Sequence, residues 1–215
     1  VFSPEINMPD KWNYAMSATI PMVNMHLTGT ATPVAGGPTI NVKDSEVGLG
    51  DLVLQPIMLN YQSSPDFAIT SRLTVYAPTG DYTKGKLANT GKNYWSYEPT
   101  VSFFYFGKKN GREAALYLGT TFNGENDATD YKSGTQFHAE TTLAQHFPLA
   151  GGLAGVGLTG AYFRQIGNDT GDGATFGRFR SKSVSAGPAI SYIGKMGGHP
   201  LSAELKWLNE FEVNN

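Results

Sequence analysis

His138 and Glu140 carry the groups most able to act together in chemistry. They lie two positions apart, and alternate side chains of a β-strand share a face. An imidazole beside a carboxylate can begin a metal site or act as a general base. His146 falls on the same predicted face but roughly 26 Å further along the strand, too far to join them. We therefore favour a hydrogen-bonded pair in a strand face and predict no metal site.

A lipase-like serine hydrolase of the outer membrane is the sharper chemical alternative. Ser133 and His138 are five residues apart, so on a strand they would point to opposite faces and form no catalytic pair. The loop 168–173 offers oxygen ligands for calcium, but its spacing does not fit the twelve-residue calcium loop. No glycine-rich loop ends in Gly-Lys-Ser/Thr. The sequence therefore predicts no catalytic residues, no cofactor and no enzyme.

The elements that must position these residues follow a regular rhythm. Alternating-polarity segments of roughly ten residues are joined in turn by a tight turn and a long polar loop. We expect about ten strands, and strict alternation of connection length puts all tight turns at one end of the molecule. The sequence therefore predicts an all-β fold, a transmembrane antiparallel up-and-down β-barrel forming one domain over residues 1–215. The predicted strands cover residues 2–7, 12–25, 49–61, 67–77, 94–106, 112–122, 136–147, 153–166, 183–193 and 201–211; the long polar loops cover 26–47, 79–93, 123–134 and 167–182.

Composition agrees with this interpretation. The formal net charge of -2 argues against a nucleic-acid surface, and the chain has no Cys, as is common in exported bacterial proteins. No run of about eighteen apolar residues predicts a membrane-spanning helix. The mean hydropathy of -0.27 is compatible with a barrel, whose strands alternate apolar and polar residues. Because Val1 lies inside a predicted strand segment, we expect a mature or trimmed piece of a longer protein.

Alternation assigns the faces of the strands. In residues 67–77 the odd positions are mostly apolar and suit lipid, whereas the even positions, among them Arg72 and Tyr76, suit water. Rings such as Trp95, Tyr97 and Tyr105 fall on the outer face of their segment, as in an aromatic girdle. In residues 49–61 we place Leu52, Leu54 and Met58 outward, and Asp51, Val53, Gln55 and Ile57 inward. Proline lacks the N–H that a ladder needs, so Pro21, Pro56, Pro99 and Pro188 predict bulges or strand ends near the rim.

The inward positions supply the candidate site. Charges and rings on these positions could select solutes by size, charge and stacking. Alternatively, the charged groups simply neutralise one another across a packed interior, since an inward charge needs partners where water is scarce. The candidate pore-lining residues are Asp51, Gln55, Arg72, Tyr76, Glu98, Glu113, Tyr117, His138, Glu140, Glu204 and Lys206.

Several motifs resemble one family in order and spacing. They include Gly48-Leu49-Gly50-Asp51-Leu52, Tyr76-Ala77-Pro78-Thr79-Gly80-Asp81-Tyr82, Leu87-Ala88-Asn89-Thr90-Gly91-Lys92-Asn93-Tyr94-Trp95-Ser96, Phe122-Asn123-Gly124-Glu125-Asn126, Tyr131-Lys132-Ser133-Gly134-Thr135-Gln136-Phe137-His138-Ala139-Glu140 and Lys206-Trp207 with Glu210-Phe211. From about residue 48 to residue 215 the chain is similar to the Gram-negative outer-membrane family of phenol-degradation meta-pathway transporters. The resemblance implies a twelve-stranded monomeric channel for small, often apolar or aromatic compounds. Two departures, no strand before Val1 and no closing strand after Asn215, imply that about ten of those strands are represented.

The function expected from these features is passive uptake of small hydrophobic or aromatic molecules across the bacterial outer membrane. The expected partners are such solutes, outer-membrane lipid and lipopolysaccharide, with no nucleic acid and a monomeric state. Arg178, Arg180 and Lys182 could meet lipopolysaccharide phosphates or merely be solvated. Two other classes stay open, an outer-membrane β-barrel enzyme and a soluble ligand-binding β-barrel, although sorted loops and aromatic belts disfavour the second.

Overall fold

The computed structural model describes residues 1–4, 6–31, 39–175 and 180–214, and its regular elements are strands. No helix in these residues is long and apolar enough to cross a membrane. The strands are β1 (Trp12–Thr19), β2 (Met22–Ala31), β3 (Ile40–Leu49), β4 (Leu52–Ser64), β5 (Phe67–Ala77), β6 (Ser96–Phe106), β7 (Arg112–Asn123), β8 (Gln136–Leu149), β9 (Gly152–Gln165), β10 (Lys182–Met196), β11 (His199–Lys206) and β12 (Asn209–Asn214).

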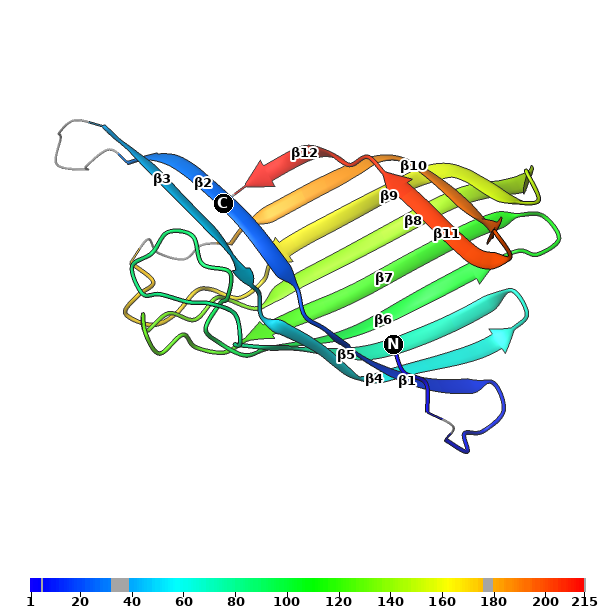
Figure 1. The fold of residues 1–215 in the computed structure, drawn as a ribbon, viewed down its shortest axis with the longest axis horizontal. Coiled ribbons are helices and arrows are strands. Elements are labelled where there is room, and N and C mark those ends of the chain that lie inside the picture. Colours follow the sequence, from blue (N-terminus) through cyan, green and yellow to red (C-terminus); the bar gives the residue numbers. More distant parts are fainter. Residues whose placement is uncertain (5, 32–38, 176–179, 215) are drawn as a thin grey trace.

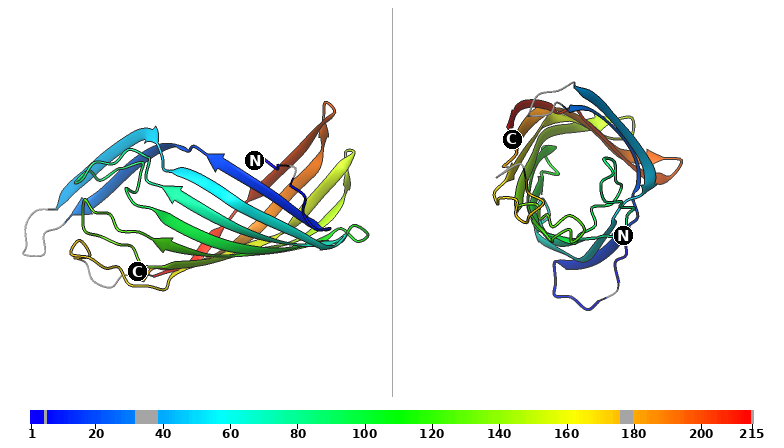
Figure 2. Two further views of the ribbon diagram at one scale, coloured as in Figure 1. Left: turned by 90° about the horizontal axis from the view of Figure 1, so that it is seen from below. Right: turned by 90° about the vertical axis from the view of Figure 1, so that its left-hand side faces the viewer.

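One large antiparallel sheet contains all strands except β2 and β3. Its order is β1-β4-β5-β6-β7-β8-β9-β10-β11, with β12 paired to the other half of β10. From β4 to β11 each strand pairs with the next along the chain, which is the up-and-down order that was predicted. The sheet curls around its concave face (Figures 1 and 2), although β1 and β11 are not paired with each other in the described residues. The predicted all-β barrel fold is therefore confirmed.

Tight turns and long loops are sorted to opposite ends, as the sequence predicted. In Figure 1 the long loops gather at the left end of the strands and the short connections at the right. Two of the short turns, Ala150-Gly151 and Gly197-Gly198, have positive φ at both residues. This geometry matches the right-handed twist of the flanking strands and favours glycine. We call the two ends the tight-turn end and the long-loop end.

The prediction of a polar loop over residues 26–47 was wrong. Most of this segment forms a regular antiparallel hairpin, in which β2 and β3 pair from Met22↔Leu49 to Ala31↔Ile40. The hairpin projects beyond the long-loop end of the sheet (Figure 1). The alternation of apolar and polar residues continues in β2 only to Leu27, and in β3 Asp44 and Glu46 share the face of Val42, so the signal by which the other strands were recognised is weak here.

Pro21 lies at a strand end and Pro56 at a bulge, as predicted, whereas Pro99 and Pro188 lie within β6 and β10. Pro21 separates β1 from β2, and its carbonyl accepts a hydrogen bond from Gly50 N (2.8 Å) on the neighbouring strand pair. Pro99 leaves a gap in the ladder between β6 and β7. Pro188 lies where β11 gives way to β12, and its carbonyl accepts from Trp207 N (3.0 Å). Each position avoids the ladder bond that proline cannot donate.

A bulge at Pro56 corrects two face assignments in β4. Two residues, Gln55 and Pro56, stand where β5 offers only Thr74, because Leu54 pairs with Val75 but Ile57 pairs with Leu73. Directly opposed residues share a face. Ile57 therefore points outward, where it is 44% exposed, and Met58 lies on the inner face opposite Arg72. Strict alternation assigned both of these residues to the wrong face because a bulge shifts the period by one residue.

Burial in this sheet is the inverse of that in a soluble protein. The buried apolar residues of the described chain are all alanines, whereas the buried polar residues include Glu98, Thr121, His146 and Gln165. On the outer face, large apolar side chains lie exposed in neighbouring ladder positions: Leu143, Val156, Leu158, Ile190 and Leu205 are each at least 50% exposed. A continuous apolar band of this kind needs a nonaqueous partner, and a lipid bilayer provides one.

Candidate functional site

The polar belt on the concave face is centred on Glu98. In β6 the exposure alternates residue by residue, with Ser96, Glu98 and Thr100 buried and the intervening residues exposed. The ladder sets Thr74 of β5 opposite Glu98. This alternation turns the carboxylate toward the inside of the curved sheet, which we call the lumen.

Four side chains from three strands surround the Glu98 carboxylate. The hydroxyls of Tyr76 (3.3 Å) and Thr121 (2.8 Å) donate to Oε2, and the Tyr117 hydroxyl donates to Oε1 (3.3 Å). His138 Nε2 lies 3.6 Å from the same Oε1. An ionised carboxylate only accepts hydrogen bonds, so a ring of donors is its appropriate environment. We call Glu98 and these four side chains the Glu98 belt.

Glycine shapes the wall beside this belt. Gly119 of β7 is opposite His138 of β8, and a Cβ built on Gly119 would collide with the imidazole. The missing side chain lets the His138 ring lie against the wall, 5.5 Å from the Tyr117 ring centre. His146 repeats the arrangement with Gly155 of β9. The two glycines thus allow both imidazoles to lie close against the wall.

Other predicted lining residues pair among themselves. Glu113 Oε2 lies 2.6 Å from His146 Nε2, toward the tight-turn end. The Gln55 side chain accepts from Ser17 Oγ (2.8 Å) and donates to Thr74 Oγ1 (3.4 Å) beside the β4 bulge. Arg72 faces the lumen opposite Thr100, and its buried Nε has no hydrogen-bond partner within the described residues. Glu113 and Gln55 therefore have hydrogen-bond partners in the wall, whereas the Nε–H of Arg72 has none among the described residues.

Lys206 reaches residues that are distant in the sheet order. Its Nζ lies 3.2 Å from Glu204 Oε2 on the same strand. It also lines a cavity of 170 Å³ together with Phe104, Tyr117 and Glu140, which belong to β6, β7 and β8. A residue of β11 thus lines the same cavity as residues of β6, β7 and β8.

A second, larger cavity lies toward the tight-turn end. Its volume is 480 Å³, and its lining includes Phe104 and Phe106 of β6, Leu153 of β9 and Ile193 of β10. The two phenylalanine rings are stacked with centroids 6.4 Å apart, and the rings of Phe106 and His146 lie edge to face with centroids 5.0 Å apart. Gln62, Asp66 and Lys108 also line this cavity, which is otherwise mostly apolar, and we call it the aromatic chamber.

Asp51 does not line the lumen as a free carboxylate. It is 9% exposed, and its oxygens accept from Gly80 N (3.0 Å) and Lys92 N (2.9 Å) of the loop between β5 and β6. Its role in the structure is to hold that loop. Carboxylates that accept backbone N–H groups in loops are common structural anchors, which face assignment alone cannot distinguish from lining residues.

Asp169 is a similar anchor in the loop 168–173, whose spacing does not fit a calcium-binding loop. Its carboxylate accepts from Tyr131 Oη (2.7 Å), Gly134 N (2.9 Å) and Gln165 Nε2 (2.6 Å). Burial, together with the hydrogen bond to Asp169, raises the pKa of Tyr131 to about 12. Among the described residues no group of three His, Cys, Asp or Glu side chains is arranged to hold a metal ion.

The cations at the end of that loop are only partly described. Arg180 Nε donates to Asn168 Oδ1 (2.8 Å), and Lys182 Nζ lies 2.8 Å from Glu212 Oε2 of β12. Arg178 lies outside the described residues. Arg180 and Lys182 thus have partners within the chain.

Some lumenal residues were left off the candidate list, although His146 had been assigned to the same face as His138. Thr121, Phe104, Phe106 and His146 were not among the candidates. The even positions of residues 96–106 share the face of Glu98, so alternation did carry the signal for Phe104 and Phe106.

These features define a class of protein, the outer-membrane β-barrels: a curved up-and-down sheet, polar inside and apolar outside, with sorted loops. Within that class, the chain belongs to the family described as "Putative MetA-pathway of phenol degradation", whose model matches residues 4–215. The resemblance read from the sequence motifs is therefore confirmed.

A solved structure supports the fold independently. The chain is similar to the COG4313 outer membrane channel from Pseudomonas putida F1, with a TM-score of 0.64 and 14% sequence identity. The match covers 94% of this chain and 80% of that one. A search of curated proteins finds no match.

Proposed function

We propose that this protein is an outer-membrane channel for passive uptake of small apolar or aromatic molecules. One observation carries the proposal: the Glu98 belt and the aromatic chamber share the concave face, while the opposite face bears the exposed apolar band. In this proposal the outer partners are membrane lipid and lipopolysaccharide, and one copy of the chain supplies the path for the solute. Family membership and the fold of a known outer-membrane channel support it.

The lumen has the chemistry for solutes with an aromatic body and at most one polar group. Phe104 and Phe106 provide stacking surface, and the Glu98 carboxylate can accept a hydrogen bond from a solute hydroxyl. Polar and apolar sites in series let a solute bind weakly at each point and move on, as conduction requires.

The alternatives fit the observations less well. A soluble binding barrel keeps its large apolar side chains inside, whereas here Leu158 and Leu205 are exposed by 67% and 66% on the outer face. A serine hydrolase would need Ser133 and His138 to form a catalytic pair. Ser133 instead lies in the loop before β8 and accepts a hydrogen bond from Gln136 Nε2 (3.4 Å), while His138 faces Glu98.

The first test is single-channel conductance of the full-length protein in a planar bilayer. Liposome uptake of phenol and toluene, beside a sugar of similar size, then measures selectivity. Discrete conductance with faster uptake of the aromatic compounds is expected. No conductance and no uptake would refute the proposal.

Adjacent positions on β7 provide a matched control. Gly119 faces the lumen and Thr120, its neighbour, is paired with Phe137 on the outer face. We expect Gly119→Trp to reduce conductance and uptake because an indole would fill the path beside the Glu98 belt. Thr120→Trp, which adds the same ring toward lipid, should leave both unchanged.

A further inference from the structure

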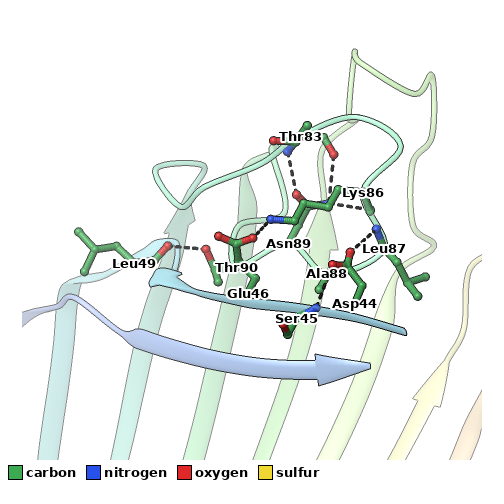
Figure 3. Close-up of polar contacts among 10 residues, drawn as sticks. All are labelled: Asp44, Ser45, Glu46, Leu49, Thr83, Lys86, Leu87, Ala88, Asn89 and Thr90. Carbon is green, nitrogen blue, oxygen red and sulfur yellow. Dashed lines mark hydrogen bonds and ion pairs between the residues drawn. The ribbon is translucent and has the colours of Figure 1, made fainter. Parts of the chain in front are cut away.

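The β2–β3 hairpin and the loop 78–95 between β5 and β6 are held together by several polar contacts. Figure 3 shows the loop lying against β3. Asp44 Oδ2 accepts hydrogen bonds from Leu87 N (3.0 Å) and Ala88 N (2.8 Å), and Lys86 forms an ion pair with Glu46. Ala88, directly beneath Asp44, is fully buried. The tip of the loop is therefore docked on the hairpin by charge-assisted contacts.

The base of the same loop is held differently. Thr90 Oγ1 donates to Leu49 O (2.8 Å), and the loop closes on itself where Gly91 N donates to Asp81 O (3.0 Å). At this crossing a Cβ on Gly80 would lie 2.7 Å from Gly91 Cα, so the two strands of the loop touch backbone to backbone. Together with the Asp51 anchor, these contacts make a compact base.

The loop lies over the lumen. Viewed from the long-loop end, part of it falls within the ring that the strands outline (Figure 2, right). Lys92 Nζ is 5.4 Å from the centre of the Tyr76 ring, and Tyr76 in turn donates to Glu98. The loop is thus in direct contact with the Glu98 belt that it covers.

The contacts at the tip are easier to break than those at the base. The side chains of Lys86 and Glu46 are 34% and 22% exposed, whereas Asp51 is 9% exposed. Partly exposed ion pairs contribute little and are weakened by salt. The hairpin itself pairs with no strand of the main sheet in the described residues, so its position depends on the break at Pro21 and on the loop. The tip can therefore undock while the base stays in place.

We propose that the loop 78–95 is a gate over the lumen and that the β2–β3 hairpin is the latch that holds it closed. Breaking the Lys86–Glu46 pair and the Asp44 contacts frees the loop tip and opens the long-loop end of the channel. The gate rests on the proposed channel function, but docking of the loop on the hairpin can be measured without transport. Backbone hydrogen bonds, chiefly from Ala88, lower the pKa of Asp44, so the latch carboxylate stays ionised at neutral pH.

The docking test uses Ala88→Cys, which is a unique thiol because the chain has no Cys. A water-soluble maleimide should label it slowly, since position 88 is fully buried under the hairpin. Adding Lys86→Ala or Asp44→Ala should accelerate labelling at least about tenfold. Lys84→Ala is the matched control, because Lys84 lies in the same loop and has no polar contact in the described chain. Fast labelling in the Ala88→Cys protein alone would overturn the latch.

Single-channel recording of the same variants in the full-length protein tests the gate. We expect Lys86→Ala and Asp44→Ala to raise the open probability several-fold and Lys84→Ala to leave it unchanged. High salt should open the native channel in the same way. Unchanged gating despite faster labelling, in a channel that conducts, would overturn the gate. No conductance in any variant, with labelling still accelerated, would instead overturn the proposed channel function.

Discussion

Replacing Glu98 by Gln tests whether the belt recognises a solute hydroxyl. The native carboxylate accepts three protein hydroxyls at 2.8, 3.3 and 3.3 Å, whereas its two oxygens can together accept about four hydrogen bonds. Glutamine has nearly the same shape, but only its carbonyl oxygen accepts. We therefore expect the phenol hydroxyl to lose a charge-assisted hydrogen bond, whereas toluene, which has no hydroxyl, loses nothing.

The size of the effect follows from the strength of such bonds. A hydrogen bond to a charged group contributes about 1.5–3 kcal/mol and a neutral one about 0.5–1.5 kcal/mol, so the exchange costs the solute about 1 kcal/mol. This corresponds to roughly a fivefold lower occupancy of the belt by phenol. Water in the lumen competes for the same groups, which places the estimate at the lower end of the range.

The assay is the ratio of initial phenol uptake to initial toluene uptake by liposomes at low solute concentration. Glu98→Gln should lower this ratio about fivefold, and Glu140→Gln should not. Glu140 is the matched control because it shares the lumenal face but has no hydrogen bond or ion pair in the described residues. An unchanged ratio in Glu98→Gln, or an equal drop in both variants, would refute hydroxyl recognition by Glu98.

Three further outcomes follow from the wall and the loops. Leu158→Arg places a charge in the outer apolar band and should destabilise the protein folded in lipid vesicles by about 2–4 kcal/mol in urea titrations; a negligible change would contradict a lipid-facing wall. Tyrosinate absorbance should show Tyr131 titrating near pH 12. Because this pKa is raised, the stabilisation from the Tyr131–Asp169 hydrogen bond is fully present below pH 10 and is lost as the pH rises through 12. Asp169→Ala should return the pKa of Tyr131 toward its ordinary value of 10.0. Asp51→Ala removes two charge-assisted hydrogen bonds to the β5–β6 loop and should lower the free energy of local opening of this loop by about 2 kcal/mol. The loop amides should then exchange their hydrogens faster, and unchanged protection factors would contradict the anchoring role.

The sequence carried enough information for the fold class and most strand faces. Alternation is a local property: in the segment 67–77, Arg72 and Tyr76 were assigned to the inner face, and the ladder places them with Thr100 and Ser96 on that face. The alternating lengths of the connections likewise predicted the two ends of the molecule. These signals survive in sequence because a lipid-facing strand has to repeat apolar residues at a period of two.

Local reasoning failed where the chain shifts that period or follows it only weakly. The bulge at Pro56 moved Ile57 outward and Met58 inward, and the alternation that marks the other strands is weak in the β2–β3 hairpin. Pro56 marked the position of the bulge in the sequence. The number of β4 residues that oppose each β5 residue, however, is set by the pairing with the neighbouring strand.

What the sequence by itself determined is therefore the alternation of the wall, the sorting of its connections and the residue types that face inward. Only the tertiary structure decided which inward groups meet: Glu98 gathers three hydroxyls from two strands, Asp51 holds a loop instead of lining the lumen, and Lys86 meets Glu46 of the hairpin. The physical reason is that a residue's face depends on its own backbone, whereas its partners depend on the ladder register and on loops that cross from distant strands.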